Sequence, residues 1–414
     1  MLDNVNELSL NIIGGCNFMY ISEKAKSISP STTLAIDAKF KQMKADGIDV
    51  VGFGAGEPDF DTPQYIKDAA IKAINEGKTK YTPAAGTVEL RKAICKKLKD
   101  ENGLDYTFDQ IVVSNGAKHS LVNAFQAILN PGDEVIIPAP FWVSYPEMVK
   151  LADGVPVILQ TTEEDEFKFT AEAFKAAIND KTRALVLNSP SNPTGMVYTK
   201  EELSAIAKVA IENNIYVISD EIYEHLVYEG EVTSIAAICP EMKDLTIIIN
   251  GVSKTYAMTG WRIGYSAAPA PIAKVMSNIQ SHATSNPNSI AQAATVAALS
   301  GGQDEIAVMK KAFRERRDYM VERINAIEGV SCLKPQGAFY VLMNISALKG
   351  RYIGDTLIGS SDDFANALLE RAKVALVPCS GFGNDNFVRW SYATSMENIK
   401  EGIDRVENFI KLTH

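Results

Sequence analysis

Short apolar runs alternate with amphipathic stretches from about residue 110 to 270. The amphipathic stretches, such as 119–129 and 200–213, have the spacing of helices with one buried face. The runs between them contain few polar positions, which is typical of strands buried on both faces of a parallel sheet. We therefore expect an α/β fold with a mostly parallel seven-stranded sheet sandwiched by helices. The predicted strands lie near 111–113, 134–137, 155–159, 183–187, 215–219, 245–249 and 262–265.

The pattern changes after about residue 305. A charged helix is predicted over 310–327, and shorter apolar runs follow it before a terminal helix. This order is typical of a smaller α+β domain. Because 414 residues exceed what one small core accommodates, we expect a large domain over 65–305 and a small domain formed by 1–64 and 306–414.

Residues 1–18 have no clear periodicity and precede Met19. A translated bacterial ribosome-binding site would produce a Gly14-Gly15 pair at this distance from a start codon. One hypothesis is that Met19 is the native start and that 1–18 are a mis-called or added leader. The alternative is an authentic N-terminal arm, and the upstream DNA distinguishes the two.

The net charge of −10 argues against a surface for nucleic acid or for anionic membranes. The five cysteines are scattered without CxxC spacing, which is typical of reduced thiols and not of a disulfide framework or a zinc site. No apolar run is long enough to span a bilayer, and the N-terminus lacks the basic region of a signal peptide. We expect a cytoplasmic protein without a nucleic-acid or membrane partner.

Polar clusters follow several of the predicted strands. In open α/β sheets, binding sites form beyond the carboxyl ends of the strands, so these clusters should converge on one crevice. They are Ser114–Lys118, Ser189–Gly195, Asp220–Tyr223 and Ser253-Lys254.

The first cluster suits a phosphate group. Gly116 and Ala117 stand at a strand-to-helix turn, where backbone N–H groups at the positive end of a helix attract anions. The signal is weak alone, because many such turns carry a small residue. Two nucleotide motifs are incomplete, since 52–57 lacks the third glycine of a dinucleotide fingerprint and 76–79 lacks the upstream glycine of a P-loop.

Lys254 follows a strand that should be buried, and Arg262 is the other full charge nearby. It could be an ordinary surface lysine with a buried stem. Burial beside a second cation would instead lower the pKa of its amine and free the lone pair for reaction with an aldehyde. Asp220 could be a helix N-cap or a carboxylate that faces a cationic ring nitrogen. Pyridoxal 5'-phosphate combines an aldehyde, a phosphate and a pyridine nitrogen.

Other polar residues have ordinary structural explanations. Glu221, Glu224 and His225 match no standard ligand spacing, and a solvated helix face accounts for them, so we predict no metal site. The arginines of 314–317 are also interpreted as a solvated helix face. Cys379 should pack in the small domain, because nothing nearby would lower its thiol pKa.

The motifs "SPSNPTG", "SDEIYEHL", "SKTYAMTGWRIGY" and "VRWSYATS" resemble those of the fold-type I, class I aminotransferases, which depend on pyridoxal 5'-phosphate. The resemblance runs from about residue 24 to the C-terminus. With "GEPDFDTP" and "KTKYTPAAG", the chain is most similar to bacterial aspartate aminotransferases of the gamma (Ib) subgroup.

The resemblance implies roles for the polar clusters. Lys254 would bind the cofactor covalently and act as general base and acid, and Asp220 would pair with the pyridinium nitrogen. Tyr223 and Asn192 would hydrogen-bond the phenolate oxygen, while Trp142 would stack on the ring. The implied phosphate ligands are Gly116, Ala117, Lys118, Ser253, Arg262 and, from the partner subunit of a homodimer with shared active sites, Tyr81.

For the substrate, the resemblance implies that Arg389 clamps the α-carboxylate through its bidentate fork. Gly56 would lie against the substrate, and Trp142 and Asn192 would also contact it. The implied reaction is the reversible transfer of the amino group from L-aspartate to 2-oxoglutarate by a ping-pong mechanism, which gives oxaloacetate and L-glutamate.

The amino-acid specificity stays open at this point. Where the alpha subgroup carries an arginine, the chain has Gln280-Ser281, and the gamma subgroup also lacks that arginine. Aromatic amino acids, alanine and prephenate are alternative substrates, and a carbon–sulfur lyase of the same fold is an alternative enzyme. A transcription regulator with an aminotransferase-like domain is disfavoured, because the net charge is acidic and few residues precede the resemblance.

Overall fold

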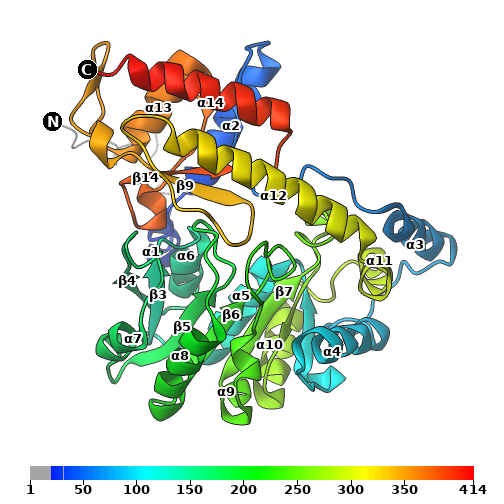
Figure 1. The fold of residues 1–414 in the computed structure, drawn as a ribbon. Coiled ribbons are helices and arrows are strands. Elements are labelled where there is room, and N and C mark those ends of the chain that lie inside the picture. Colours follow the sequence, from blue (N-terminus) through cyan, green and yellow to red (C-terminus); the bar gives the residue numbers. More distant parts are fainter. Residues whose placement is uncertain (1–19, 31) are drawn as a thin grey trace, which may run out of the picture.

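The computed structural model describes residues 20–30 and 32–414, so the hypotheses on residues 1–18 and Met19 lie outside the described residues. Seven strands form one sheet in the order β2-β8-β7-β6-β5-β3-β4 (Figure 1). Neighbours from β7 to β4 pair in parallel, and β8 pairs antiparallel with both β7 and β2. The strands are β2 Ile111–Ser114, β3 Glu134–Ala139, β4 Val155–Gln160, β5 Thr182–Asn188, β6 Tyr216–Asp220, β7 Thr246–Gly251 and β8 Gly264–Ala267.

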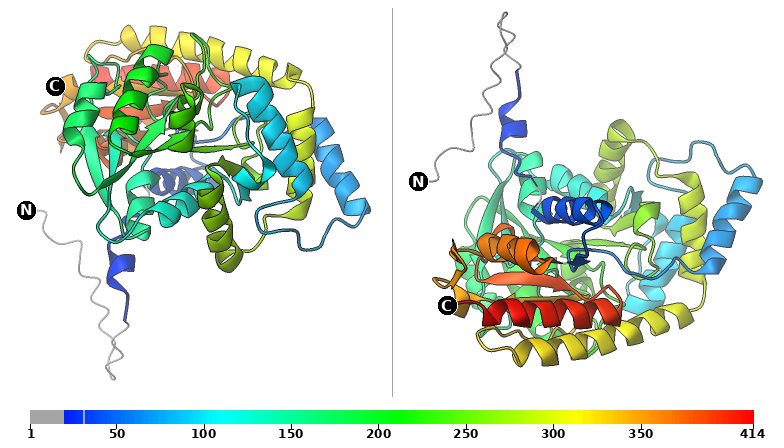
Figure 2. Two further views of the ribbon diagram at one scale, coloured as in Figure 1. Left: turned by 90° about the horizontal axis from the view of Figure 1, so that it is seen from below. Right: turned by 90° about the horizontal axis from the view of Figure 1, so that it is seen from above.

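Helices cover both faces of this sheet, because successive side chains of a strand point to opposite sides. On β3, Val135 and Ile137 pack in one cluster with α5, α6 and α10, whereas Ile136 packs in another with α7, α8 and α9. Figures 1 and 2 show the two helical layers. These helices are α5 Ala117–Ile128, α6 Ser144–Leu151, α10 Ala270–Ala283, α7 Ala171–Ala177, α8 Lys200–Glu212 and α9 Pro240–Asp244. The continuous apolar runs thus correctly indicated a sheet buried on both faces.

A third layer lies beside the β2 edge of the sheet. Here Ile66, Ile94 and Ala294 belong to one apolar cluster that also contains Ile111 of β2. They come from α3 (Gln64–Asn75), α4 (Val88–Asn102) and α11 (Ser289–Ser300). In Figure 1, α3 projects furthest from the sheet.

The C-terminal part forms a separate three-stranded antiparallel sheet in the order β13-β14-β9. The N-terminal segment packs with this part of the chain, because β1 pairs in parallel with β12 through Val51 and Val374 in a separate two-stranded sheet. The strands are β1 Val51–Gly52, β9 Tyr340–Asn344, β12 Val374–Ala375, β13 Val377–Pro378 and β14 Phe387–Ser391, with a short hairpin of β10 (Tyr352–Ile353) and β11 (Thr356–Leu357). The helices of this part are α2 Thr32–Ala45, α12 Asp304–Asn325, α13 Ser361–Ala372 and α14 Met396–Lys411, whereas the short helix α1 (Glu23–Lys26) lies beside α6, where Lys24 pairs with Asp153 over 2.8 Å.

Helix α12 connects the two parts. Ile306 in its first turn packs with α3, α4 and α11, whereas Met309 and Phe313 pack in the core of the C-terminal part. We keep the domain boundaries of 65–305 and of 1–64 with 306–414 as a proposal, which these two clusters support.

One prediction for α12 is wrong. The Arg317 side chain has no exposed surface; it donates to the Pro335 carbonyl oxygen over 2.8 Å and pairs with Glu229 and Asp318 at 2.9 and 2.7 Å. The loop before β9 covers Arg317, so the prediction fails at this position, whereas Arg314 is exposed as predicted. Arg316 also pairs with Asp59, at 2.7 Å.

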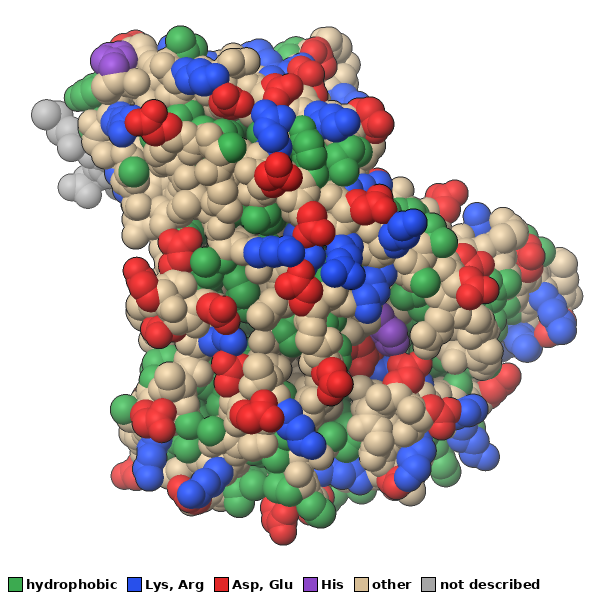
Figure 3. Space-filling view, in the orientation of Figure 1, with side chains coloured by type: hydrophobic (Ala, Val, Ile, Leu, Met, Phe, Trp, Pro, Cys, Tyr) green, Lys and Arg blue, Asp and Glu red, His purple; other side chains and the backbone are tan. Residues whose placement is uncertain are grey.

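Charged side chains are spread over the face of the molecule that Figure 3 shows. On the face in Figure 3, acidic and basic side chains are intermingled over both the upper and the lower part. Within residues 20–30 and 32–414, no helix combines the length and the apolar character that crossing a bilayer requires.

Candidate active site

The polar strand ends meet in one cavity of about 400 Å³. It opens where β5, β6 and β7 end, and the segment around Gly56 and strand β14 close it from the C-terminal part. The predicted residues that line it are Gly56, Ala117, Lys118, Trp142, Asn192, Asp220, Tyr223, Ser253, Lys254, Arg262 and Arg389. Gly116 adjoins it, whereas Tyr81 is 91% exposed and does not line it.

Lys254 lies in the turn after β7 and is partly buried. Its ammonium donates to the carbonyl oxygen of Gly56. Burial lowers the pKa of the amine to about 8, and the positive charges of Arg262 and Arg389 act in the same direction, while Glu57 and Asp220 oppose them. The predicted direction of this pKa shift and its causes agree with the structure. A fraction of the amine is therefore unprotonated and nucleophilic near neutral pH.

Asp220 is the last residue of β6 and is buried. Burial raises the pKa of its carboxyl to about 6, against hydrogen bonds that favour the ionised form. Tyr145 donates its hydroxyl to Oδ2 over 2.6 Å, and the Ile222 N–H donates to Oδ1 over 3.3 Å. Because this carboxylate is shielded from water, a nearby cation would strongly stabilise its ionised form.

The first turn of α5 and Arg262 form a compact cradle whose charge and N–H groups are suited to an anion. Gly116 caps the helix with φ +85°, and an added Cβ would lie 2.4 Å from Nη2 of Arg262. Arg262 also has a left-handed backbone, with φ 56°, so β8 begins at Gly264 and not at Arg262 as predicted. Burial and Arg262 lower the pKa of Lys118, whose ammonium lies 4.6 Å from the centre of the Trp142 ring.

Gln280 supports this cradle from behind and does not line the cavity. Its amide oxygen accepts from Ser114 and Asn123 over 2.6 and 2.9 Å, and its amide nitrogen donates to the carbonyl oxygens of Ala84 and Val113 over 2.6 and 2.7 Å. With both ends of the amide bonded, Gln280 has no group available for a substrate.

Arg389 projects from the middle of β14 and is buried. Its guanidinium donates from Nη1 to the side-chain oxygen of Asn192 over 3.1 Å and from Nη2 to the carbonyl oxygen of Gly54 over 3.0 Å. Within the described part of the chain, its Nε has no hydrogen-bond partner. A buried guanidinium that lines a cavity is suited to a carboxylate.

Residues that the motifs did not indicate complete the site. Tyr145 holds Asp220, and Tyr340 places its hydroxyl 3.0 Å from that of Tyr223. Asn188 accepts from the Asn192 N–H over 2.7 Å and donates to the Asp220 carbonyl oxygen over 2.9 Å. In sequence, the two tyrosines look like core aromatics; for Tyr145 the one usable signal is its position three residues after Trp142.

The interpretation of Glu221 and Glu224 as a solvated face is wrong, because both side chains are buried. The loop after β6 folds under α4, where Glu224 forms an ion pair with Lys97 and accepts from Asn102 over 2.9 Å. Glu221 accepts from Ser219 and Ser234 over 2.8 and 2.6 Å, and burial raises its pKa to about 7.

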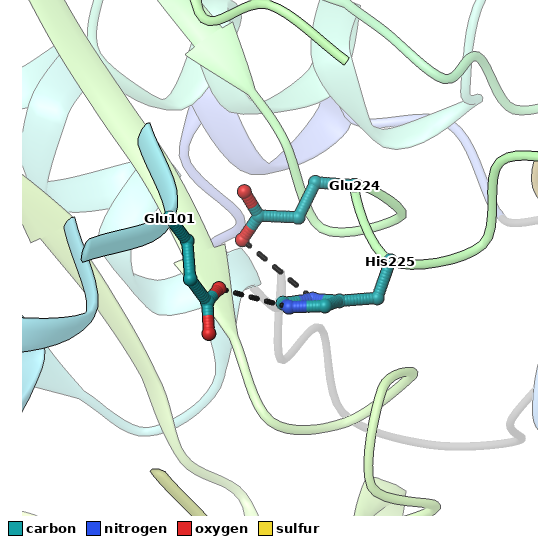
Figure 4. A group of neighbouring side chains, drawn as sticks. All are labelled: Glu101, Glu224 and His225. Carbon is teal, nitrogen blue, oxygen red and sulfur yellow. Dashed lines mark hydrogen bonds and ion pairs between the residues drawn. The ribbon is translucent and has the colours of Figure 1, made fainter. Parts of the chain in front are cut away.

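Glu224, His225 and Glu101 lie close together (Figure 4). His225 interacts with Glu101 over 2.9 Å and, on its other side, with the Thr255 hydroxyl over 3.2 Å. The Lys97 ammonium pairs with Glu224 and lies 3.5 Å from Glu101. This ammonium already supplies the positive charge that the acidic side chains face, and the group contacts Thr255, which directly follows Lys254, through His225.

The sequence pattern of the family described as aminotransferase class I and II matches residues 48–406. The chain belongs to this family.

Individual aminotransferases resemble it over nearly its full length. A relative named aspartate aminotransferase, from Bacillus sp. (strain YM-2), is 54% identical over 392 residues, which are 94% of this chain and 99% of that protein. A relative named aspartate/prephenate aminotransferase, from Nitrosomonas europaea, is 47% identical over 396 residues, which are 95% of this chain and 100% of that protein. The structure of an aspartate aminotransferase from Thermus thermophilus with maleate is 44% identical, with a TM-score of 0.90 over 94% of this chain and 100% of that chain. The predicted family and fold class are confirmed.

Proposed function

We propose that this aminotransferase binds pyridoxal 5'-phosphate covalently at Lys254. With it, the enzyme transfers the amino group of L-aspartate reversibly to 2-oxoglutarate, which gives oxaloacetate and L-glutamate. The strongest support is the placement of a lysine with a pKa of about 8 between a buried carboxylate and an anion cradle. The names of its aminotransferase relatives support the choice of aspartate.

The residues around the cavity fit this cofactor. An added Cβ at Gly116 would collide with Arg262, so the cradle accommodates a group that approaches the backbone closely. Asp220 stands in a dry position where a pyridinium nitrogen would stabilise its ionised form. When bound, the cofactor supplies an aldehyde that condenses with amines and a ring that accepts electrons from the α-carbon.

The cofactor ring would be held from several sides. Asp220, fixed by Tyr145, would keep the ring nitrogen protonated, and Trp142 would cover one ring face. Tyr223 and Asn192 would donate hydrogen bonds to the phenolate oxygen. The amine of Lys254 would then remove the proton from the substrate α-carbon and return it at a different atom, which its near-neutral pKa favours.

Phosphate and substrate would occupy opposite ends of the cavity. Arg389, whose guanidinium lines the cavity, would bind the α-carboxylate, and Gly56 would leave room for the substrate. The proposed phosphate ligands are Gly116, Ala117, Lys118, Ser253 and Arg262, with Tyr81 of the partner subunit.

We further propose a cytoplasmic homodimer with shared active sites. Tyr81 is 91% exposed, and Ile71 and Ile74 on neighbouring α3 are also exposed. A second copy that covers this surface would bury these apolar side chains. The scattered cysteines, of which four lie unpaired in the described part of the chain, support a reducing compartment.

Two experiments test the function. Borohydride reduction of the holoenzyme and peptide mapping should place the cofactor on Lys254; a label on another residue, or no label, contradicts the proposal. A donor panel of aspartate, alanine and aromatic amino acids with 2-oxoglutarate, and prephenate as an alternative acceptor, should give the highest kcat/KM for aspartate. Release of pyruvate and ammonia from cysteine-type substrates without an acceptor would instead indicate a carbon–sulfur lyase.

A further inference from the structure

We propose that Tyr340 is a positioning residue of the transamination site. Its hydroxyl would orient the Tyr223 phenol towards the cofactor, and its ring would support Arg389 at the substrate carboxylate. One side chain of the C-terminal sheet would thereby connect the cofactor-binding and carboxylate-binding groups. The inference rests on the function proposed above.

Tyr340 contacts both groups directly. Its hydroxyl lies 3.0 Å from that of Tyr223, and the two rings meet edge to face, with centroids 5.9 Å apart. The Arg389 guanidinium lies 4.4 Å from the centre of the Tyr340 ring, within the range of a cation–π interaction. Both tyrosines are buried, and Tyr340 lines the cavity.

The packing around Tyr340 leaves its ring little freedom. Phe339 lies 4.7 Å from the Tyr340 ring and 5.4 Å from the Tyr223 ring, measured between centroids. On β9 and β14, Tyr340 pairs with Ser391 and Leu342 pairs with Arg389. The hydroxyl reaches the segment that covers Lys254, because a Cβ added at Gly56 would lie 3.4 Å from the Tyr340 oxygen.

The number of available protons fixes the direction of the hydrogen bond in the holoenzyme. Burial raises the pKa of both phenols, so each carries one proton at neutral pH. If Tyr223 donates its proton to the phenolate oxygen of the cofactor, it can only accept from Tyr340. A hydroxyl that accepts one hydrogen bond donates a stronger one. Tyr340 would thus strengthen the stabilisation of the phenolate by Tyr223.

The Tyr340→Phe variant tests the hydroxyl because it removes one oxygen and keeps the ring. The cofactor titration, in which the absorption of the bound cofactor is followed against pH, should shift to a higher midpoint by about 0.5 unit. The reason is that a weaker hydrogen bond stabilises the phenolate less. KM for the amino acid should stay within about twofold of wild type, because the ring beside Arg389 remains. Tyr340→Leu, which removes the ring, should raise KM about tenfold.

Two further variants separate positioning from loss of packing. Tyr392→Phe removes another buried hydroxyl of the same cluster, which donates to the Ala338 carbonyl oxygen over 3.2 Å; it should leave the cofactor titration unchanged. In a Tyr223→Phe background, Tyr340→Phe should cause no additional shift, because it acts through Tyr223. An unchanged titration in Tyr340→Phe, or a shift that persists in that background, overturns the inference. Absence of cofactor at Lys254 would instead overturn the proposed function.

Discussion

Single residues in the cavity have pKa values that burial brings towards neutrality. Burial lowers the pKa of Lys254 to about 8 and raises that of Asp220 to about 6. Each group loses part of its hydration, and only part of the loss is compensated by hydrogen bonds from Tyr145 and to Gly56. Such groups exchange protons readily at physiological pH, and their burial reduces the stability of the cofactor-free protein.

Lys254→Met should therefore stabilise the cofactor-free protein at pH 7, by about 2 kcal/mol. Below pH 8 the lysine is charged in both the folded and the unfolded state, so the folded wild type bears the full free-energy cost of burying the charge. Between pH 8 and 10.5 the unfolded state binds more protons, and the wild type becomes more stable relative to the variant. Urea unfolding at pH 7 and pH 10 measures the difference, with the exposed Lys208→Met as control. A less stable variant at pH 7 would contradict the prediction.

At the scale of elements, the site depends on where strands end and helices begin. Helix α5 starts directly after β2, and Gly116 allows Arg262 to approach its first turn. Behind the site, Lys97 on α4 and Glu224 after β6 form a buried ion pair. Thr255, linked to this group through His225, follows the lysine of the site. The packing that buries these groups thus also fixes the positions of the loops after β6 and β7, which contain residues of the site.

Gly116→Ala should lower the affinity for pyridoxal 5'-phosphate about tenfold or more, because the new Cβ displaces Arg262 from the cradle. Gly132→Ala is a matched control. Its φ of +86° is nearly the same as the +85° of Gly116, yet no atom lies within 4 Å of the added Cβ. It should cost about 1 kcal/mol of stability without affecting cofactor affinity. Titration of the two cofactor-free variants with pyridoxal 5'-phosphate compares their affinities. Equal affinities would contradict the proposal that Gly116 and Arg262 bind the phosphate.

Lys97→Met should destabilise the protein by about 3–5 kcal/mol, because it leaves the Glu224 carboxylate buried without a counter-charge. Lys97 holds the pKa of Glu224 at about 2, so this stabilisation is present above pH 4.5 and is lost as the pH falls towards 2. Changing Glu224 to Met as well should recover much of the loss. Lys99 lies on the same helix as Lys97 and forms an exposed pair with Asp105 beyond the end of that helix; Lys99→Met should change stability by less than about 1 kcal/mol. Similar urea midpoints for the Lys97 and Lys99 variants would contradict this.

The sequence predicted best the elements that contain a short continuous apolar run. All seven strands of the large sheet were found in this way, including the edge strand β4, which is only partly buried. Strand β14 was not predicted, since Arg389 interrupts its apolar run. Polar residues were misjudged where a distant segment covers a helix or loop, as at Glu224 and Arg317. Periodicity describes one element at a time, so it does not show which segment will cover a charged face.

At the scale of the whole molecule, the cavity combines groups from both parts of the chain. The large sheet contributes Lys254 and Asp220, whereas Arg389 and Tyr340 come from the C-terminal sheet. Helix α12 packs into the cores of both parts, so they are connected by a continuous helix. Tyr81 stands outside the cavity of its own chain, which is expected if it completes the site of a second copy.

Co-expression of Lys254→Ala and Tyr81→Ala chains should restore activity. A mixed dimer with shared sites has one site in which Lys254 from one chain meets Tyr81 from the other, so random pairing gives roughly a quarter of wild-type activity. Co-expression of Lys254→Ala with Asp220→Ala is the control, because both residues belong to the same chain's site and no mixed dimer contains an intact one. Activity no higher than the sum of the separate variants would rule out shared sites.

The pairing of β1 with β12 also determines when this site can exist during protein synthesis. Val51 finds its partner Val374 only after the intervening chain has been translated, roughly 20–60 s later at about 5–20 residues per second. The Gly54 carbonyl, which holds Arg389, follows directly after this strand. In a nascent chain, all strands of the large sheet and its lysine are therefore synthesised before Arg389 and the partner of β1. If Arg389 binds the substrate carboxylate as proposed, amino-acid recognition is the last property that the chain acquires, near the end of translation.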